Sequence, residues 1–123
     1  MQIRMYSDES GTTAIEFAIV GPIFIFLIVS IAFLCMGMAV AGSMHYAVEE
    51  GARCASVRKM VCSDEDTTIA YTKSHYFGPG GVPTFDYDPV APCGHSVTAS
   101  INYVVDIGLK KITVPLTAAA CFP

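Results

Sequence analysis

One acidic side chain lies directly beside a long stretch that carries no charge. Glu16 precedes residues 17–44, and none of these is Asp, Glu, Lys, Arg or His. A lone carboxylate at the edge of a membrane is costly to bury, and such groups are usually partnered. We therefore consider an ion-pairing role for Glu16. The alternative is a solvated carboxylate that lies idle in the headgroup layer.

Cysteine thiols are the second group that could do chemistry, and the chain has five. Cys35 falls within the uncharged stretch, where we expect it to act as a small apolar packing residue. The other four, Cys54, Cys62, Cys93 and Cys121, all follow that stretch. An even number of cysteines in a small domain predicts two disulfides and an oxidising compartment.

Four cysteines allow three pairings, and a hairpin argument favours one of them. If the last two predicted strands turn near residues 107 and 108, Cys93 and Cys121 face each other, because residue 107 lies midway between them. Cys54 and Cys62 would then close a short loop. We expect the pairs Cys93–Cys121 and Cys54–Cys62.

Other reactive sites lack the necessary patterns. There is no CxxC, and Cys93-Gly94-His95 is spaced too tightly for a usual zinc site. His45 and His75 are better explained as surface or interface residues. The sequence FGPGG follows a predicted helix and has no lysine partner, so it indicates a turn. We expect no metal, no cofactor and no catalytic activity, and the net charge of −4 argues against nucleic-acid binding.

The uncharged stretch has the length and composition of a membrane anchor. Its 28 residues would form a helix about 42 Å long, whereas a bilayer core of about 30 Å needs about 20 residues. A cleavable secretory signal would be shorter and more basic at its start, where only Arg4 is found here. We predict a single-pass transmembrane helix over residues 12–44.

The anchor is expected to continue as a stem helix over residues 45–59. Pro22 should kink or loosen the first turns. Ser30, Gly37 and Ala41 are spaced seven and four residues apart, so they share a face that permits close approach of another helix. The alternative is that a membrane helix is simply rich in small residues.

Residues 60–123 are predicted to form a small head. A helix should run from about Asp64 to Phe77 and stop at the glycine-rich turn of residues 78–81. Strands are expected at residues 82–89, 95–106 and 112–122, with Pro115 indicating an edge position or a bulge. One face of the second strand should carry Val97, Ala99, Ile101 and Tyr103. The predicted fold class is α+β: a long anchor and stem helix, then a disulfide-braced head with a short helix and a small antiparallel sheet.

Three segments together resemble a known family. Gly11, four residues, then Glu16 and Phe17 before an apolar helix is similar to the prepilin-peptidase signal of type IV-like pilins in its Tad/Flp version. The sequence EGAR, residues 50–53 (Glu50, Gly51, Ala52, Arg53), resembles the segment that follows the anchor in TadE-like proteins. The apolar end, residues 120–123, also fits. The chain therefore resembles the TadE-like minor pilins, or pseudopilins, of the Tad pilus.

The resemblance implies a structural protein that is processed and assembled. A prepilin peptidase would cut after Gly11, removing a leader of residues 1–11 and making Thr12 the new amino terminus. Glu16 would then pair with the α-amino group of Thr12, in its own or a neighbouring subunit, and set the stagger of packed helices. Implied partners are the membrane, the peptidase and other pilin-like subunits, including a paralogous minor pilin, in a system that serves bacterial adhesion.

The resemblance also implies a location, although the charge distribution argues against it. The protein would lie in the bacterial inner membrane with its carboxyl-terminal head in the periplasm, or enter the pilus or its base. Arg4 precedes the anchor, whereas Arg53, Arg58 and Lys59 follow it, and the positive-inside rule would place the head in the cytoplasm. We give the four cysteines more weight. The alternative function is an unprocessed, membrane-anchored extracytoplasmic binding domain, which would keep Met1.

Overall fold

A computed structural model of the chain describes residues 10–106 and 108–123. Most of the leader expected at residues 1–11 therefore lies outside the described residues, as does residue 107 of the expected turn. Five elements follow in the order α1 (Ser10–Val57), α2 (Glu65–Ser74), β1 (Thr84–Ala91), β2 (Gly94–Asp106) and β3 (Lys111–Phe122). They divide into two compact units, with the boundary between Leu34 and Cys35.

The first unit contains the amino-terminal part of α1. The helix continues through Pro22. The large hydrophobic residues of this part, between Ile15 and Leu34, are mostly exposed rather than packed in a core. One helix, Gly11–Val57, is long and apolar enough to cross a membrane.

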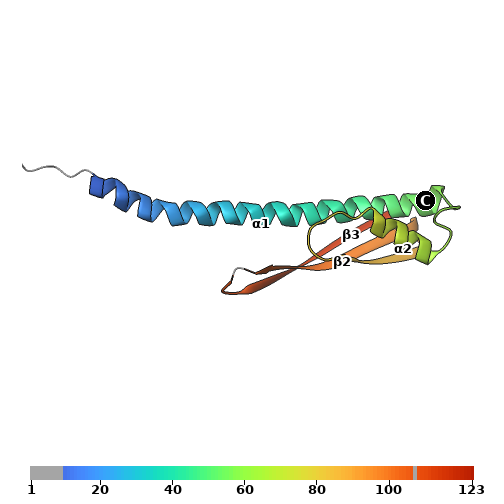
Figure 1. Cartoon of the computed structure of the whole chain (residues 1–123). Helices are drawn as coiled ribbons and strands as arrows, with labels where there is room; N and C mark the ends of the chain where they lie inside the picture. Colours follow the sequence, from blue (N-terminus) through green and yellow to red (C-terminus); the bar gives the residue numbers. More distant parts are fainter. Residues whose placement is uncertain (1–9, 107) are drawn as a thin grey trace, which may run out of the picture. The chain divides into compact units, whose positions relative to one another are not determined.

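The second unit is built on the carboxyl-terminal part of α1. The three strands form an antiparallel sheet in the order β1-β2-β3, and α1 lies along it with α2 next to β1 (Figure 1). The core joins one face of α1 to the sheet. From α1 it takes Val40, Met44, Ala47, Val48 and Ala52, and from the sheet Phe85, Val97, Ala99 and Ala118.

These elements confirm the predicted α+β fold, with a long apolar helix, a short helix, an antiparallel sheet and two disulfides. The face predicted for β2 is correct: Val97 and Ala99 are buried, and Ile101 and Tyr103 pack beside them. β3 is an end strand of the sheet, where Pro115 can be accommodated because it has no N–H to donate.

The short helix ends earlier than the sequence predicted. α2 stops at Ser74 rather than near Phe77, and His75 caps it with its backbone N–H directed at the carbonyl oxygens of Thr72 and Lys73. The N–H of His75 lies 3.1 Å from the Thr72 oxygen, which is the tight bond of a closing turn.

The disulfides join Cys54 to Cys62 and Cys93 to Cys121. This pairing is the one predicted from the sequence. The argument that Cys93 and Cys121 face each other across the hairpin is wrong, however. Cys121 lies opposite Ser96 in the β2–β3 ladder, whereas Cys93 lies in the turn before β2. The bond therefore ties the end of β3 to the β1–β2 turn. Cys35 is free and exposed.

We predict that the two disulfides stabilise the head unequally. Cys93 and Cys121 are separated by 28 residues, and Cys54 and Cys62 by 8. In the loop-entropy account the larger loop contributes about 3–4 kcal/mol and the smaller about 2–3 kcal/mol. Unfolding of the Cys93→Ala/Cys121→Ala and Cys54→Ala/Cys62→Ala double variants in detergent, followed by near-ultraviolet circular dichroism, should show this order. The reverse order would contradict the account.

Candidate functional site

The residues of the expected processing site lie in the first turns of α1. Gly11, Thr12, Glu16 and Phe17 are all exposed. Within residues 10–106 and 108–123, the structure gives the Glu16 carboxylate neither an ion-pair nor a hydrogen-bond partner. Its side chain is thus accessible to a group from outside the described chain.

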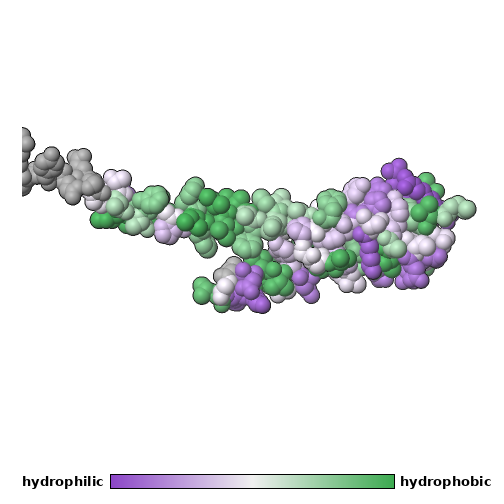
Figure 2. All heavy atoms as spheres, in the orientation of Figure 1, coloured by the Kyte–Doolittle hydropathy of each residue, from purple (hydrophilic) through white to green (hydrophobic). Residues whose placement is uncertain are grey.

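Before Cys35, the anchor segment exposes nearly all of its apolar side chains. Figure 2 shows it as a largely hydrophobic surface, in contrast to the more polar head. Phe17, Phe24 and Phe26 are 78%, 60% and 75% exposed. Ser30 is a polar residue within the uncharged stretch, and its Oγ donates to the carbonyl oxygen of Phe26 at 2.8 Å. Because that hydroxyl is satisfied within its own helix, the segment can lie in lipid or against another helix at little polar cost.

The small residues expected to form one open face have different surroundings. Ala41 is half-buried, and so is Gly37, where an added Cβ would lie 3.8 Å from the ring of Tyr103. The head of the same chain therefore covers part of the expected face at Gly37. The stretch before Cys35 has the exposed surface that could meet a second helix.

The EGAR segment divides between packing and surface positions. Gly51 and Ala52 are buried, whereas Glu50 is half-buried and Arg53 is exposed. An added Cβ at Gly51 would lie 3.2 Å from the Cβ of Thr72 and closer still to its Oγ1. Helix α2 thus crosses α1 so tightly at this point that only glycine fits without movement. Glu50 and Arg53, with Glu49, line an open groove beside Ala119–Phe122 of β3.

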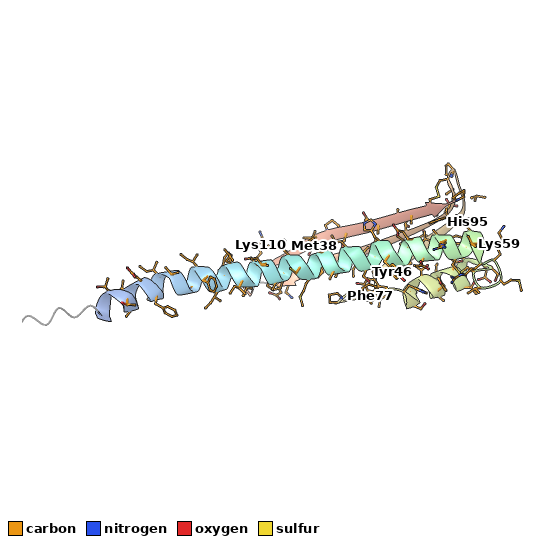
Figure 3. All side chains as sticks on the ribbon, turned by 90° about the horizontal axis from the view of Figure 1, so that it is seen from above. Met38, Tyr46, Lys59, Phe77, His95 and Lys110 are labelled. Carbon is orange, nitrogen blue, oxygen red and sulfur yellow. A yellow bond between two sulfur atoms is a disulfide. The ribbon has the colours of Figure 1, made fainter. Side chains whose placement is uncertain are left out.

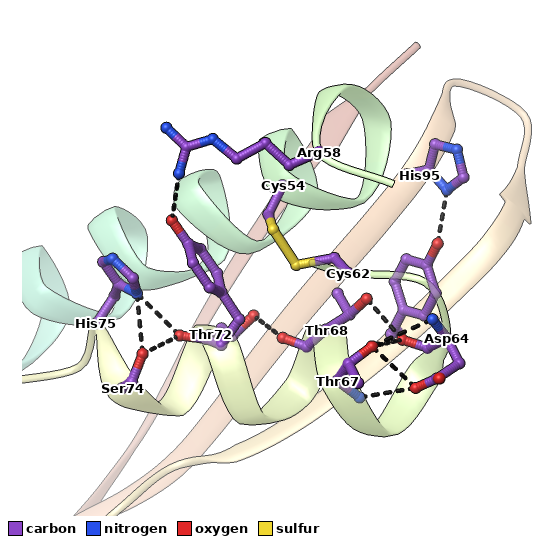
Figure 4. The surroundings of a disulfide bond; sticks show 12 residues. Cys54, Arg58, Cys62, Asp64, Thr67, Thr68, Thr72, Ser74, His75 and His95 are labelled. Atoms are coloured by element: carbon purple, nitrogen blue, oxygen red, sulfur yellow. Dashed lines mark hydrogen bonds between the residues drawn. A yellow bond between two sulfur atoms is a disulfide. The ribbon is translucent and has the colours of Figure 1, made fainter. Parts of the chain in front are cut away.

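Two buried threonines make the close crossing possible. Thr72 Oγ1 donates to the carbonyl oxygen of Thr68 at 2.8 Å, and Thr68 Oγ1 donates to that of Asp64 at 2.7 Å. Both hydroxyls are hydrogen-bonded within α2, so the helix can pack against Gly51 without leaving a buried polar group unpaired. Figure 4 shows this ladder of hydrogen bonds beside the Cys54–Cys62 disulfide.

The start of α2 is fixed by a capping box. The Asp64 carboxylate accepts from the backbone N–H of Thr67 at 2.9 Å, and Thr67 Oγ1 accepts from the backbone N–H of Asp64 at 3.2 Å. The hydrogen bond from the Thr67 backbone holds the pKa of the Asp64 carboxyl below its usual value. A lowered pKa means that the ionised form stabilises the fold. That contribution is present above the unfolded-state pKa and is lost as pH falls through the folded-state pKa.

Further contacts tie the loops of the head to α1. The Arg58 guanidinium donates to the Tyr71 hydroxyl at 3.0 Å, and Ser43 Oγ accepts from the backbone N–H of Phe77 at 2.8 Å. The Phe77 ring lies 6.0 Å from that of Tyr46 on α1, and both are labelled in Figure 3. The segment after α2 is therefore held against the stem helix by polar and aromatic contacts together.

The described histidines make local contacts. His95 Nδ1 lies 2.6 Å from the Tyr87 hydroxyl, and burial raises the pKa of that tyrosine. His75 lies against Tyr71, with ring centroids 4.3 Å apart. In the part of the chain that the structure describes, no three His, Cys, Asp or Glu side chains gather as metal ligands would.

The comparison with protein families matches one part of this chain. The family model described as TadE-like protein matches residues 11–53. This segment is TadE-like. The match begins at Gly11 and ends at Arg53, so it spans the expected processing residues, the candidate anchor and the EGAR segment, and it confirms the resemblance over these residues. Neither a curated protein nor a solved structure matches the chain.

The partners of the TadE-like segment within the head were harder to foresee. Thr68 and Thr72 have no distinguishing pattern in the sequence, yet Thr72 packs against Gly51 and Thr68 accepts the hydrogen bond of its hydroxyl. Their spacing of four residues, on the same face as Ile69, was a usable signal only if the helix was assumed to pack against α1. Tyr103 lies on the face of β2 that the alternating pattern predicts. That pattern does not indicate that its ring covers Gly37.

We predict that Gly51 of the TadE-like segment is intolerant of a methyl group. Gly51→Ala should lower the unfolding free energy of the head by about 1–3 kcal/mol, because overpacking against Thr72 outweighs the better helix propensity of alanine. Gly42→Ala is the matched control, since an added Cβ there meets nothing within 4 Å. Thermal unfolding in detergent measures both.

A second substitution separates the close crossing from a general sensitivity at Gly51. Adding Thr72→Ala to Gly51→Ala removes Oγ1 and should restore part of the lost stability. If Gly51→Ala is as harmless as Gly42→Ala, the tight crossing is not an important constraint.

Proposed function

We propose that this protein is a pilin-like, membrane-anchored component of Tad pilus biogenesis, a pseudopilin processed after Gly11. The observation that carries the proposal is that the TadE-like match and the uninterrupted apolar helix coincide, from Gly11 through the anchor. Pilin-like proteins act by assembling with one another, so we propose a structural role and no catalysis.

The first turns of α1 are suited to processing and then to assembly. The Gly11–Thr12 bond lies at the beginning of the helix, where the first N–H groups have no partner within the helix and the turn opens most readily. Cleavage there would create an α-amino group four residues before Glu16. That amino group, in the same or a neighbouring subunit, is the partner we propose for the exposed carboxylate.

The proposed assembly surface is the exposed apolar part of α1. Subunits would pack through the segment from Phe17 to Leu34, in which Pro22 and Ser30 lie, whereas Gly37 and Ala41 are partly covered by the head. The Glu50 and Arg53 side chains, exposed or half-exposed beside the groove at the end of β3, offer a polar surface for another pilin-like subunit.

The proposed location is the inner membrane, with the head in the periplasm. Two disulfides support this orientation, because such bonds persist in oxidising compartments. The basic residues Arg53, Arg58 and Lys59 point the other way under the positive-inside rule. We give the disulfides more weight, because both lie after the anchor and brace the head.

We expect the mature protein to begin at Thr12. Mass spectrometry of the amino-terminal peptide from native membranes measures this directly. Cleavage at that bond would also place the amino end on the cytoplasmic side, where prepilin peptidases remove their leaders. A chain that still begins at Met1 would contradict the pseudopilin proposal and favour an unprocessed anchored binding domain.

We expect Glu16 to be needed for assembly rather than for cleavage. The Glu16→Ala variant should be cut after Gly11 like the parent protein, yet support few or no pili, because the new α-amino group loses its counter-charge. Glu65→Ala is the control, since it removes an exposed carboxylate on α2, away from the groove at the end of β3. Electron microscopy of cells carrying each variant counts the pili. Normal piliation with Glu16→Ala would exclude the role assigned to this carboxylate.

A further inference from the structure

β2 runs alongside α1 in the opposite direction, and β3 pairs with it to form a hairpin. At one end of the sheet, Ser56 Oγ on α1 donates to the carbonyl oxygen of Pro123, next to the His95–Phe122 pair of the ladder. Further along β2, the ring of Tyr103 covers Gly37. From Ser56 to Gly37 the strands therefore follow α1 back toward its apolar stretch.

The hairpin continues beyond Tyr103. After Tyr103, β2 extends to Asp106, which pairs with Lys111 at the start of β3. Three residues of strand add about 10 Å in this direction. Figure 3 shows Lys110 further along the axis of α1 than Met38, on the side away from Lys59.

The membrane boundary falls at the same level of α1. The uncharged stretch starts at Phe17, and a bilayer core takes about 20 residues of helix, so a span beginning there ends near Met36. Gly37 and the ring of Tyr103 then lie at the interface, a position favoured by tyrosine. The tip of the hairpin lies at the end of the head from which the apolar stretch of α1 departs.

The side chains of the tip suit a lipid interface better than water. Leu109 is 97% exposed, and Val104, Ile112 and Val114 are 52%, 46% and 41% exposed. Lys111 pairs with Asp106 at 3.5 Å, whereas Lys110 has no ion-pair partner among the described residues. Figure 2 shows apolar and polar side chains together at this end of the head. Apolar side chains beside a free lysine are the combination that binds an anionic lipid surface.

We propose that the tip of the β2–β3 hairpin is a second membrane contact, in which Leu109 enters the interface and Lys110 meets lipid phosphates. The hairpin and the helix would then hold the head to the bilayer at two places. This inference rests on the proposed membrane anchoring of α1, but not on processing or pilus assembly.

Single tryptophans can test the contact, because the chain has no tryptophan of its own. The full chain is placed in vesicles of phosphatidylethanolamine and phosphatidylglycerol, with or without bromine atoms on the acyl chains. The test residue is Leu109→Trp. The matched control is Val90→Trp. Val90 is also a strongly exposed apolar residue, and it lies on β1, next to the end of β2 that is opposite the hairpin tip. Phe26→Trp reports on the anchor itself.

Brominated lipids should quench most of the emission of the Leu109→Trp and Phe26→Trp variants and leave that of Val90→Trp unchanged. Quenching with Phe26→Trp but not with Leu109→Trp would overturn the hairpin contact alone. Absence of quenching with Phe26→Trp would overturn the anchoring as well. A blue shift of Leu109→Trp that ignores bromine and grows with the protein-to-lipid ratio would show that a second copy, not lipid, covers the tip, and would also overturn the proposal.

Discussion

The structure of the head depends on how closely other elements can approach one face of α1. Between Val40 and Ala55 the buried residues of this face are no larger than methionine. Gly51 is the tightest of these positions, because the Thr72 side chain occupies the space that a Cβ would need. The capping box at Asp64 and the bond of Cys54 to Cys62 fix where α2 begins.

A single helix meets two kinds of surroundings, and its residue types change accordingly. Before Leu34 the side chains are large, apolar and exposed, as is suitable for lipid or for other membrane helices. After Val40 most of the apolar side chains are buried against the sheet and α2, whereas charged residues such as Glu49 and Arg53 are exposed. The TadE-like segment, residues 11–53, therefore contains both the anchor and the surface on which its own head is built.

The EGAR segment illustrates how one short motif can serve two purposes. Its glycine and alanine are packing residues inside the head, so their replacement should act through stability. Its glutamate and arginine lie beside the groove at the end of β3, so their replacement should act through contacts with other molecules. Measurements of stability and of assembly on the same variants would separate the two effects.

The sequence by itself determined the features that depend on local pattern. The uncharged stretch specified the apolar helix, alternation along residues 97–103 specified the inner face of β2, and Ser63-Asp64 marked the start of α2, because each signal lies within one element. The end of α2, the role of Thr72 and the contact of Tyr103 with Gly37 depended on the tertiary structure. The same holds for the reason that Cys93 reaches Cys121: the register of β2 and β3 sets Cys121 opposite Ser96, and a register is decided by how the hairpin packs on α1.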